Sequence, residues 1–141
     1  MAKKTSELLL DTCAVIWLSQ QAKMLPQAVE AIDEASDQGR PLRLSLITAW
    51  ELGLLERRGR APMTRPPHAI FQSFLQLPGV LAHQLTAEIL IDSSLLPGDL
   101  HGDPADRVII ATARALDLTV VTRDRHILNY ADKGHVRALE C

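Results

Sequence analysis

The sequence predicts an α/β fold, a three-layer α/β/α sandwich built around a central, mostly parallel sheet. Short apolar runs alternate with amphipathic segments along the chain, as strands alternate with helices in βαβ units. The chain has 141 residues, of which 47% are hydrophobic, so it is long enough to bury a core. We therefore expect residues 1–141 to form a single domain.

The first elements follow a strand–helix–helix pattern. Residues 7–10, ELLL, form a short apolar run suited to a buried strand, and residues 13–18, CAVIWL, favour a short helix. A second helix is predicted over residues 26–38. It has Pro26 in its first turn, where a missing N–H costs nothing, and it ends at Gly39.

The alternation continues through the middle of the chain. LRLSL at 42–46 alternates as a strand does, and a helix is predicted over 47–58. Residues 60–67 contain three prolines and are interpreted as a loop rather than a domain boundary. An amphipathic helix over 68–77 then leads to a short strand candidate at 80–85.

The last third repeats the pattern with a clearer strand signal. Residues 86–96 and 103–117 have helical periodicity. LTVVT at 118–122 is rich in β-branched residues and predicts a central strand. A short helix at 125–131 and an edge strand at 135–139 complete the chain.

Charge and hydropathy narrow the class of protein. The net charge of −2 gives no overall nucleic-acid footprint. The segment 56–65 is locally basic, and it suits either a solvated helix end or a contact with a phosphate backbone. No run approaches the roughly 18 apolar residues that span a bilayer, and the N-terminal leucines are too few for a secretory signal. We expect a cytoplasmic protein with no membrane segment.

Two acidic residues follow predicted strands at the edge where parallel sheets bind ligands. Asp11 comes directly after the first strand, and Asp124 comes two residues after the strand at 118–122. Both are therefore expected outside the carboxyl ends of the strands. Each also has a simpler interpretation, as the N-cap of the helix that follows it.

Three further acids lie on predicted helices. Asp103 precedes Pro104 and suits an N-cap, which puts Asp106 in the first helical turn, where the helix dipole favours a negative charge. Glu51 lies among apolar residues, with no cation at the neighbouring helical positions. It fits a capping box with Thr48, or it is a carboxylate that needs a partner when it is buried.

One fold would place these carboxylates together, and their mutual repulsion would raise their pKa values. A divalent cation relieves that repulsion. Because no histidine or cysteine lies at ligand spacing, an oxygen-only set favours Mg²⁺ or Mn²⁺. The sequence also lacks a Ser–His or Cys–His pairing for a protein nucleophile.

Four segments, taken in order, resemble the successive motifs of the PIN-domain ribonucleases, and most closely those of the VapC-type toxins of prokaryotic toxin–antitoxin pairs. They are LLLDTCAVIWL, SLITAWELGLL, GDPADRVIIATARAL and VVTRD, and the resemblance covers the chain from about residue 8 to 138. The resemblance implies a PIN-like α/β/α domain. It also implies an endoribonuclease that uses Mg²⁺ or Mn²⁺ to hydrolyse RNA phosphodiester bonds and that acts as a toxin.

The resemblance also implies roles for individual residues. The catalytic and metal-binding acids would be Asp11, Glu51, Asp106 and Asp124. Asp103 would be a further metal ligand or an N-cap, and Asp106 is favoured over it because its spacing to the apolar stripe matches the motif. Thr12 and Thr122 match hydroxyl positions that orient the acids or a water.

Partners follow from the same resemblance: an RNA substrate, a cognate antitoxin protein and a second copy in a homodimer. Candidate contacts to RNA phosphates are Arg57, Arg58, Arg107, Arg123 and Arg125. An ion pair between Arg107 and the preceding Asp106 is an equal alternative. The larger aromatic residues are expected in the core, with an antitoxin-binding surface as the alternative: Trp17, Trp50, Phe71 and Phe74.

Other functions fit the sequence less well. A haloacid-dehalogenase-like phosphatase needs a D-x-D motif, but Cys13 stands where the second Asp would be, and this cysteine is expected to be a small buried residue. A receiver-like domain needs an early acidic pair and a late lysine after a strand, and neither is evident. A PIN-fold interaction module without catalysis remains the alternative, although the four acids at motif positions argue against it.

Overall fold

The computed structural model describes residues 6–59, 63–100 and 102–141. Within them the strands are β1 (Leu8–Leu10), β2 (Leu42–Ser45), β3 (Val80–His83), β4 (Thr119–Thr122) and β5 (Arg137–Glu140). The helices are α1 (Thr12–Ser19), α2 (Pro26–Asp37), α3 (Leu46–Arg57), α4 (Pro67–Leu75), α5 (Ala87–Ser94), α6 (Pro104–Leu116) and α7 (Arg125–Asp132). Every predicted element is present, with ends shifted by a residue or two. Part of the predicted loop at 60–67 lies outside the described residues.

The five strands form one sheet in the order β3-β2-β1-β4-β5, and every pairing in it is parallel. The predicted α/β class is thus confirmed, and the sheet is wholly rather than mostly parallel. The strand at 118–122 is interior and the last strand is an edge, both as predicted.

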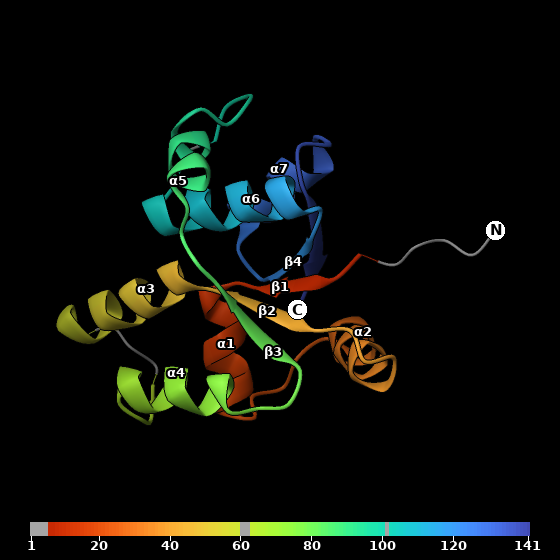
Figure 1. Ribbon diagram of the computed structural model, residues 1–141, viewed down its shortest axis with the longest axis vertical. Helices are drawn as coiled ribbons and strands as arrows, with labels where there is room; N and C mark the ends of the chain where they lie inside the picture. Colours follow the sequence, from red (N-terminus) through yellow and green to blue (C-terminus); the bar gives the residue numbers. More distant parts are fainter. Residues whose placement is uncertain (1–5, 60–62, 101) are drawn as a thin grey trace.

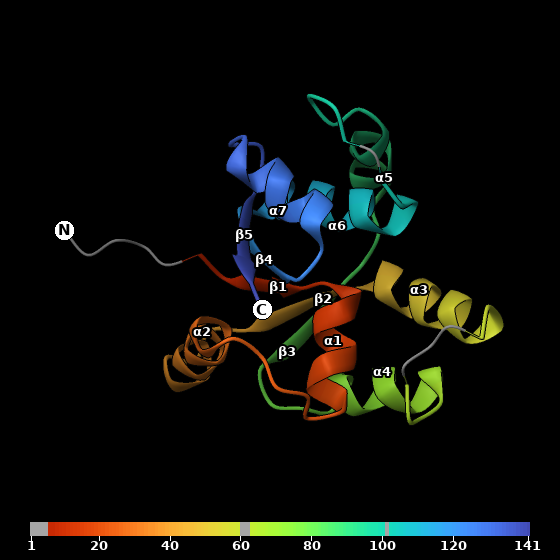
Figure 2. The ribbon, with the colours of Figure 1, turned by 180° about the vertical axis from the view of Figure 1, so that it is seen from behind.

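Helices cover both faces of the sheet (Figures 1 and 2). On one face lie α5, α6 and α7, and on the other lie α1, α2 and α4. The helix α3 projects away from the carboxyl end of β2. None of the helices in the described part of the chain has the length and apolar character needed to cross a bilayer.

The three leucines of β1 show why this strand is a continuous apolar run. Leu8 and Leu10 pack in the core beneath α1, α2 and α4, whereas Leu9 packs with Ile109 and Ile110 of α6. A strand buried on both faces has no polar side to present. Burying each leucine fully stabilises the fold by roughly 1.5–3 kcal/mol.

The expectation for the aromatic residues is only partly met. Phe74 is buried in the core, and Trp17 and Phe71 are partly buried. The prediction that Trp50 lies in the core is wrong, because half of its surface is exposed. It lies on α3, which projects beyond the sheet, so the sheet does not cover it.

The strand order also fixes where a ligand can bind. The chain steps outward from β1 to β2 and β3, then returns to the other side of β1 to form β4. This reversal makes the carboxyl ends of β1 and β4 a topological switch point, the usual binding position in open parallel sheets. The region outside these two strand ends is called the crevice below.

Candidate functional site

Asp11 lies in this crevice and is almost completely buried, with 2% of its surface exposed. Its Oδ1 accepts a hydrogen bond of 2.7 Å from the backbone N–H of Ala14, so it caps α1. Its Oδ2 accepts a hydrogen bond of 2.5 Å from the hydroxyl of Thr122. Burial raises the pKa of Asp11 to about 6, because both hydrogen bonds only partly offset the loss of hydration.

Glu51 is placed by α3 and lies beside a buried pair of hydroxyls. The hydroxyl of Thr12 donates to that of Thr48 at 3.2 Å, and a hydrogen bond with Thr12 lowers the pKa of Glu51. Desolvation outweighs this bond and raises the pKa overall, with help from the charges of Asp103 and Asp124. The expected capping box with Thr48 is wrong, because Ser45 caps α3.

Asp103 and Asp106 differ in their hydrogen bonding at the start of α6. The Oδ1 of Asp103 accepts a hydrogen bond of 2.8 Å from the N–H of Ala105 and caps the helix. No described residue forms a hydrogen bond or ion pair with the carboxylate of Asp106. Desolvation, followed by the charge of Asp124 and those of the other acids, raises the pKa of Asp106 to about 8.

Asp124 enters the crevice from the end of β4. Its Oδ1 accepts hydrogen bonds from the N–H groups of His126 and Ile127, so it caps α7. Its own N–H donates to the hydroxyl of Thr122 at 2.9 Å. The hydroxyl of Thr122 therefore donates to Asp11 and accepts from Asp124.

The five predicted acids lie within electrostatic range of one site, since the charges of Asp11, Glu51, Asp103 and Asp124 each raise the pKa of Asp106. Cys13 also lies near these acids. The expectation that it is buried is wrong: α1 already begins at Thr12, and the second helical residue is exposed rather than in the core. Partial loss of hydration, followed by the charges of the surrounding acids, raises the pKa of its thiol to about 12.

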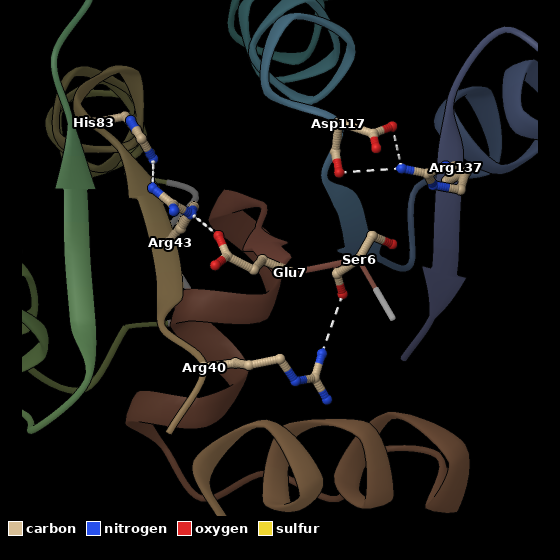
Figure 3. Close-up of polar contacts among 7 residues, drawn as sticks. All are labelled: Ser6, Glu7, Arg40, Arg43, His83, Asp117 and Arg137. Carbon is tan, nitrogen blue, oxygen red and sulfur yellow. Dashed lines mark hydrogen bonds and ion pairs between the residues drawn. The ribbon is translucent and has the colours of Figure 1, made fainter. Parts of the chain in front are cut away.

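The acids form no ion pair with a cation among the described residues, unlike charged side chains elsewhere on the sheet. Figure 3 shows Arg43 bonded to both Glu7 and His83, each at 2.5 Å, and Arg137 bonded to Asp117. The ion pairs among the described residues are these two arginine–carboxylate pairs and a third on α7 and β5. None of them involves an acid of the crevice.

This donor set fits a hard divalent cation. The ligands are carboxylate oxygens. Desolvation and neighbouring carboxylates raise the pKa values of Asp11, Glu51 and Asp106, so a bound cation would stabilise their charged forms. Within the described residues, no three acidic, histidine or cysteine side chains are close enough to form a ready-made metal site. Like charges repel, and three of the carboxylates are turned toward helix N-termini as caps.

The five arginines predicted to contact RNA differ in their partners within the protein. Arg107 donates from Nε to the carbonyl of Ser93 and from Nη1 to that of Leu100, and among the described residues it forms no ion pair with Asp106. Arg125 pairs with Glu140 at 2.8 Å. The remaining three predicted contacts do not form ion pairs with described residues: Arg57 and Arg58 at the end of α3, and Arg123 beside the crevice.

Two features next to the acids were not predicted from the sequence. Thr48 is fully buried and completes the hydroxyl pair beside Glu51. A cavity of about 460 Å³ lies between α3, α5 and α6, lined in part by Trp50, Leu90 and Arg107. A sequence gives no signal for this cavity, because its lining comes from segments far apart in the chain.

Comparisons with known proteins agree with this geometry. Residues 8–133 match the family model of the PIN domain. Ribonuclease VapC22 of Mycobacterium tuberculosis is 29% identical over 122 residues, which cover 86% of this chain and 90% of that protein.

Solved structures show the same fold. DNA-bound VapBC from Salmonella typhimurium contains a chain with a TM-score of 0.68 and 17% identity, covering 96% of this chain and 98% of that one. A toxin–antitoxin complex from Klebsiella pneumoniae contains one with a TM-score of 0.54 and 20% identity, covering 84% and 87%.

Proposed function

Since the chain belongs to the PIN domain family, we propose that it is an endoribonuclease that depends on Mg²⁺ or Mn²⁺ and acts as the toxin of a toxin–antitoxin pair. The observation that carries the proposal is the crevice at the ends of β1 and β4, where the acids form no ion pair with any described residue. The likeness to a VapC ribonuclease over most of both chains supports the choice of RNA as substrate.

Asp11, Glu51, Asp106 and Asp124 would hold the cation. Asp106 is preferred to Asp103, because Asp103 is engaged as a cap while Asp106 has no hydrogen-bonding partner among the described residues. A divalent ion, when bound, lowers the pKa of water and neutralises charge on the scissile phosphate.

The protein's own groups would prepare this crevice in two ways. Thr122 fixes the carboxylate of Asp11, so that this ligand does not have to be ordered when substrate arrives. The helices α1, α6 and α7 all begin at the crevice, and their N-terminal dipoles favour an anionic group there. The phosphate of RNA is such a group.

A cognate antitoxin and a second copy of the chain are the proposed protein partners. The resemblance in fold to chains of a toxin–antitoxin complex supports the antitoxin. For the homodimer, the support is a set of exposed apolar residues on α3 and on or just after α5, here called the α3–α5 face: Trp50, Leu90, Ile91 and Leu95. Ile91 is 60% and Leu95 is 72% exposed, a cost that association would relieve.

The decisive experiment incubates the purified protein with defined RNAs and with Mg²⁺, Mn²⁺ or EDTA. We expect metal-dependent cleavage that Asp11→Asn and Asp106→Asn each reduce by a factor of 100 or more, on the order of removing one transition-state contact. Asp132→Asn, which changes an exposed acid at the end of α7, is the matched control. Cleavage in EDTA, or full activity of either site variant, contradicts the mechanism.

A melting experiment separates the enzyme from the non-catalytic interaction module. Binding of Mg²⁺ to the native state adds RT ln(1 + [L]/Kd) to its stability and should raise the Tm. The increase should disappear in Asp106→Asn. An RNA that binds without being cut, together with no effect of Mg²⁺ on the Tm, would favour the interaction module.

A further inference from the structure

Arg123 and Trp17 form a stacked pair beside the crevice. The guanidinium carbon of Arg123 lies 4.0 Å from the centroid of the Trp17 ring, close enough for a cation–π interaction. One Nη2–H of Arg123 donates to the backbone carbonyl of Lys23 at 2.6 Å. The Trp17 ring and the Lys23 carbonyl together restrict the orientation of the guanidinium.

The helix α1 places this pair next to the acids. Cys13 is exposed, and the charges of Asp11, Glu51, Asp106 and Asp124 all raise the pKa of its thiol. Trp17 is four residues further on, so it lies on the same face of α1 about 5–6 Å away. Along the other segment, Arg123 directly precedes Asp124.

Arg123 nevertheless does not neutralise the crevice. It forms no ion pair with a described carboxylate, and its charge is not among those that set the pKa values of Asp11, Glu51 or Asp106. Its charge does lower the pKa of the Cys141 thiol, with which it also shares a hydrogen bond. A guanidinium has five N–H donors in a fixed plane, so donors remain for a ligand.

We propose that Arg123, held in place by Trp17, binds the phosphate next to the scissile one, so that an RNA strand runs from the crevice along the exposed face of α1. The proposal rests on the proposed function. An oriented guanidinium suits a phosphate group, which it can bind through two parallel hydrogen bonds. Trp17 is a positioning residue: it does not touch the phosphate but restricts the guanidinium that does.

The test measures the affinity for a fluorescent single-stranded RNA as a function of salt, with Asp106→Asn present throughout to prevent cleavage. Arg123→Gln should weaken binding about tenfold and reduce the slope of log K against log[salt] by about 1, as for one lost phosphate contact. Arg123→Lys should keep the slope, because it keeps the charge. Arg137→Gln, which removes an exposed arginine paired with Asp117, should change neither.

Trp17 is tested in the same assay. Trp17→Ala should weaken binding about threefold, and Trp17→Phe should restore most of the loss because a ring remains under the guanidinium. An abasic strand should show the same losses. Losses that vanish with the abasic strand would instead indicate stacking on a base and overturn the proposal.

The melting temperature distinguishes a structural role. If Arg123→Gln lowers the Tm but leaves the salt slope unchanged, the stack only ties α1 to β4 and the proposal is wrong. If the unsubstituted chain cuts RNA while the slope stays unchanged in Arg123→Gln, only the subsite fails. If the unsubstituted chain neither binds nor cuts RNA, the proposed function fails, and this inference fails with it.

Discussion

The hydroxyl of Thr122 donates a 2.5 Å hydrogen bond to Oδ2 of Asp11, joining the ends of two neighbouring strands, β4 and β1. The same hydroxyl oxygen accepts the N–H of Asp124 at 2.9 Å. Because Thr122 is fully buried, water cannot replace either bond. One side chain thus sets the positions of two acids that come from distant parts of the sequence.

Replacement of Thr122 by Val should therefore impair the site more than the fold. The variant keeps the shape but removes the bond that stabilises the Asp11 carboxylate, so the pKa of Asp11 should rise further above 6. We expect cleavage at neutral pH to fall at least tenfold and the acidic limb of the pH–rate profile to move to higher pH. Steady-state cleavage rates between pH 5 and 9 measure both effects.

The matched control is Thr119→Val, at the other end of β4. Its hydroxyl shares a 2.6 Å hydrogen bond with Ser6, far from the acids. This variant should lose some stability, about 1 kcal/mol, without any change in the pH profile. An unchanged profile in Thr122→Val would show that the hydroxyl does not control Asp11.

Stability without metal should fall as the pH rises. The pKa of Asp106 is raised from near 4 to about 8 in the folded state, so between these values the native state binds more protons than the unfolded state. Under that condition the free energy of unfolding decreases with increasing pH. Thermal melts in EDTA should give a higher Tm at pH 5 than at pH 8.

Asp106→Asn removes most of this pH dependence, because the amide has no charge to desolvate. At pH 8 its Tm should exceed that of the unsubstituted chain by about 3 °C or more. Asp132→Asn, at an exposed position on α7, should leave the curve in place. A Tm that rises with pH in the unsubstituted, metal-free protein would contradict the raised pKa.

The fold could be predicted from the sequence because local and global signals agree. The run of leucines before Asp11 and the β-branched run before Asp124 predicted two strands, and the rule for parallel sheets placed both acids at the same edge of the sheet. That these strands are neighbours became clear only in the structure. Whether each acid is a cap or a ligand could not be separated, because the same carboxylate that caps a helix can face the crevice.

Other features depended on tertiary structure. The exposure of Trp50 follows from the direction in which α3 leaves the sheet, which no periodicity encodes. The capping of α3 by Ser45 rather than Thr48 depends on where β2 ends. The stack of Arg123 on Trp17 joins residues about a hundred positions apart, and each residue alone carries no signal for it.

The α3–α5 face should hold two copies of the chain together. Ile91→Asp places a charge on its exposed centre, so we expect the dimer to dissociate and the mass measured by light scattering after gel filtration to halve. The Tm of the monomer should change little, because Ile91 packs against nothing essential in its own chain. Leu77→Asp, at a half-exposed leucine after α4, should remain dimeric. A monomeric unsubstituted chain would contradict the assignment.

Arg107 should be a structural residue rather than an RNA contact, although it lies beside Asp106. Its Nε donates to the carbonyl of Ser93 at 2.9 Å and its Nη1 to that of Leu100 at 2.7 Å, which ties the end of α5 and the following loop to α6. A lysine cannot reproduce this fork. Arg107→Lys should cost about 1–3 kcal/mol and lower the Tm by roughly 3–8 °C, while the salt slope of RNA binding stays unchanged. The variant Arg107→Gln removes the charge. If it reduced the salt slope of RNA binding by about 1 without lowering the Tm, Arg107 would be a phosphate contact and the structural assignment would be wrong.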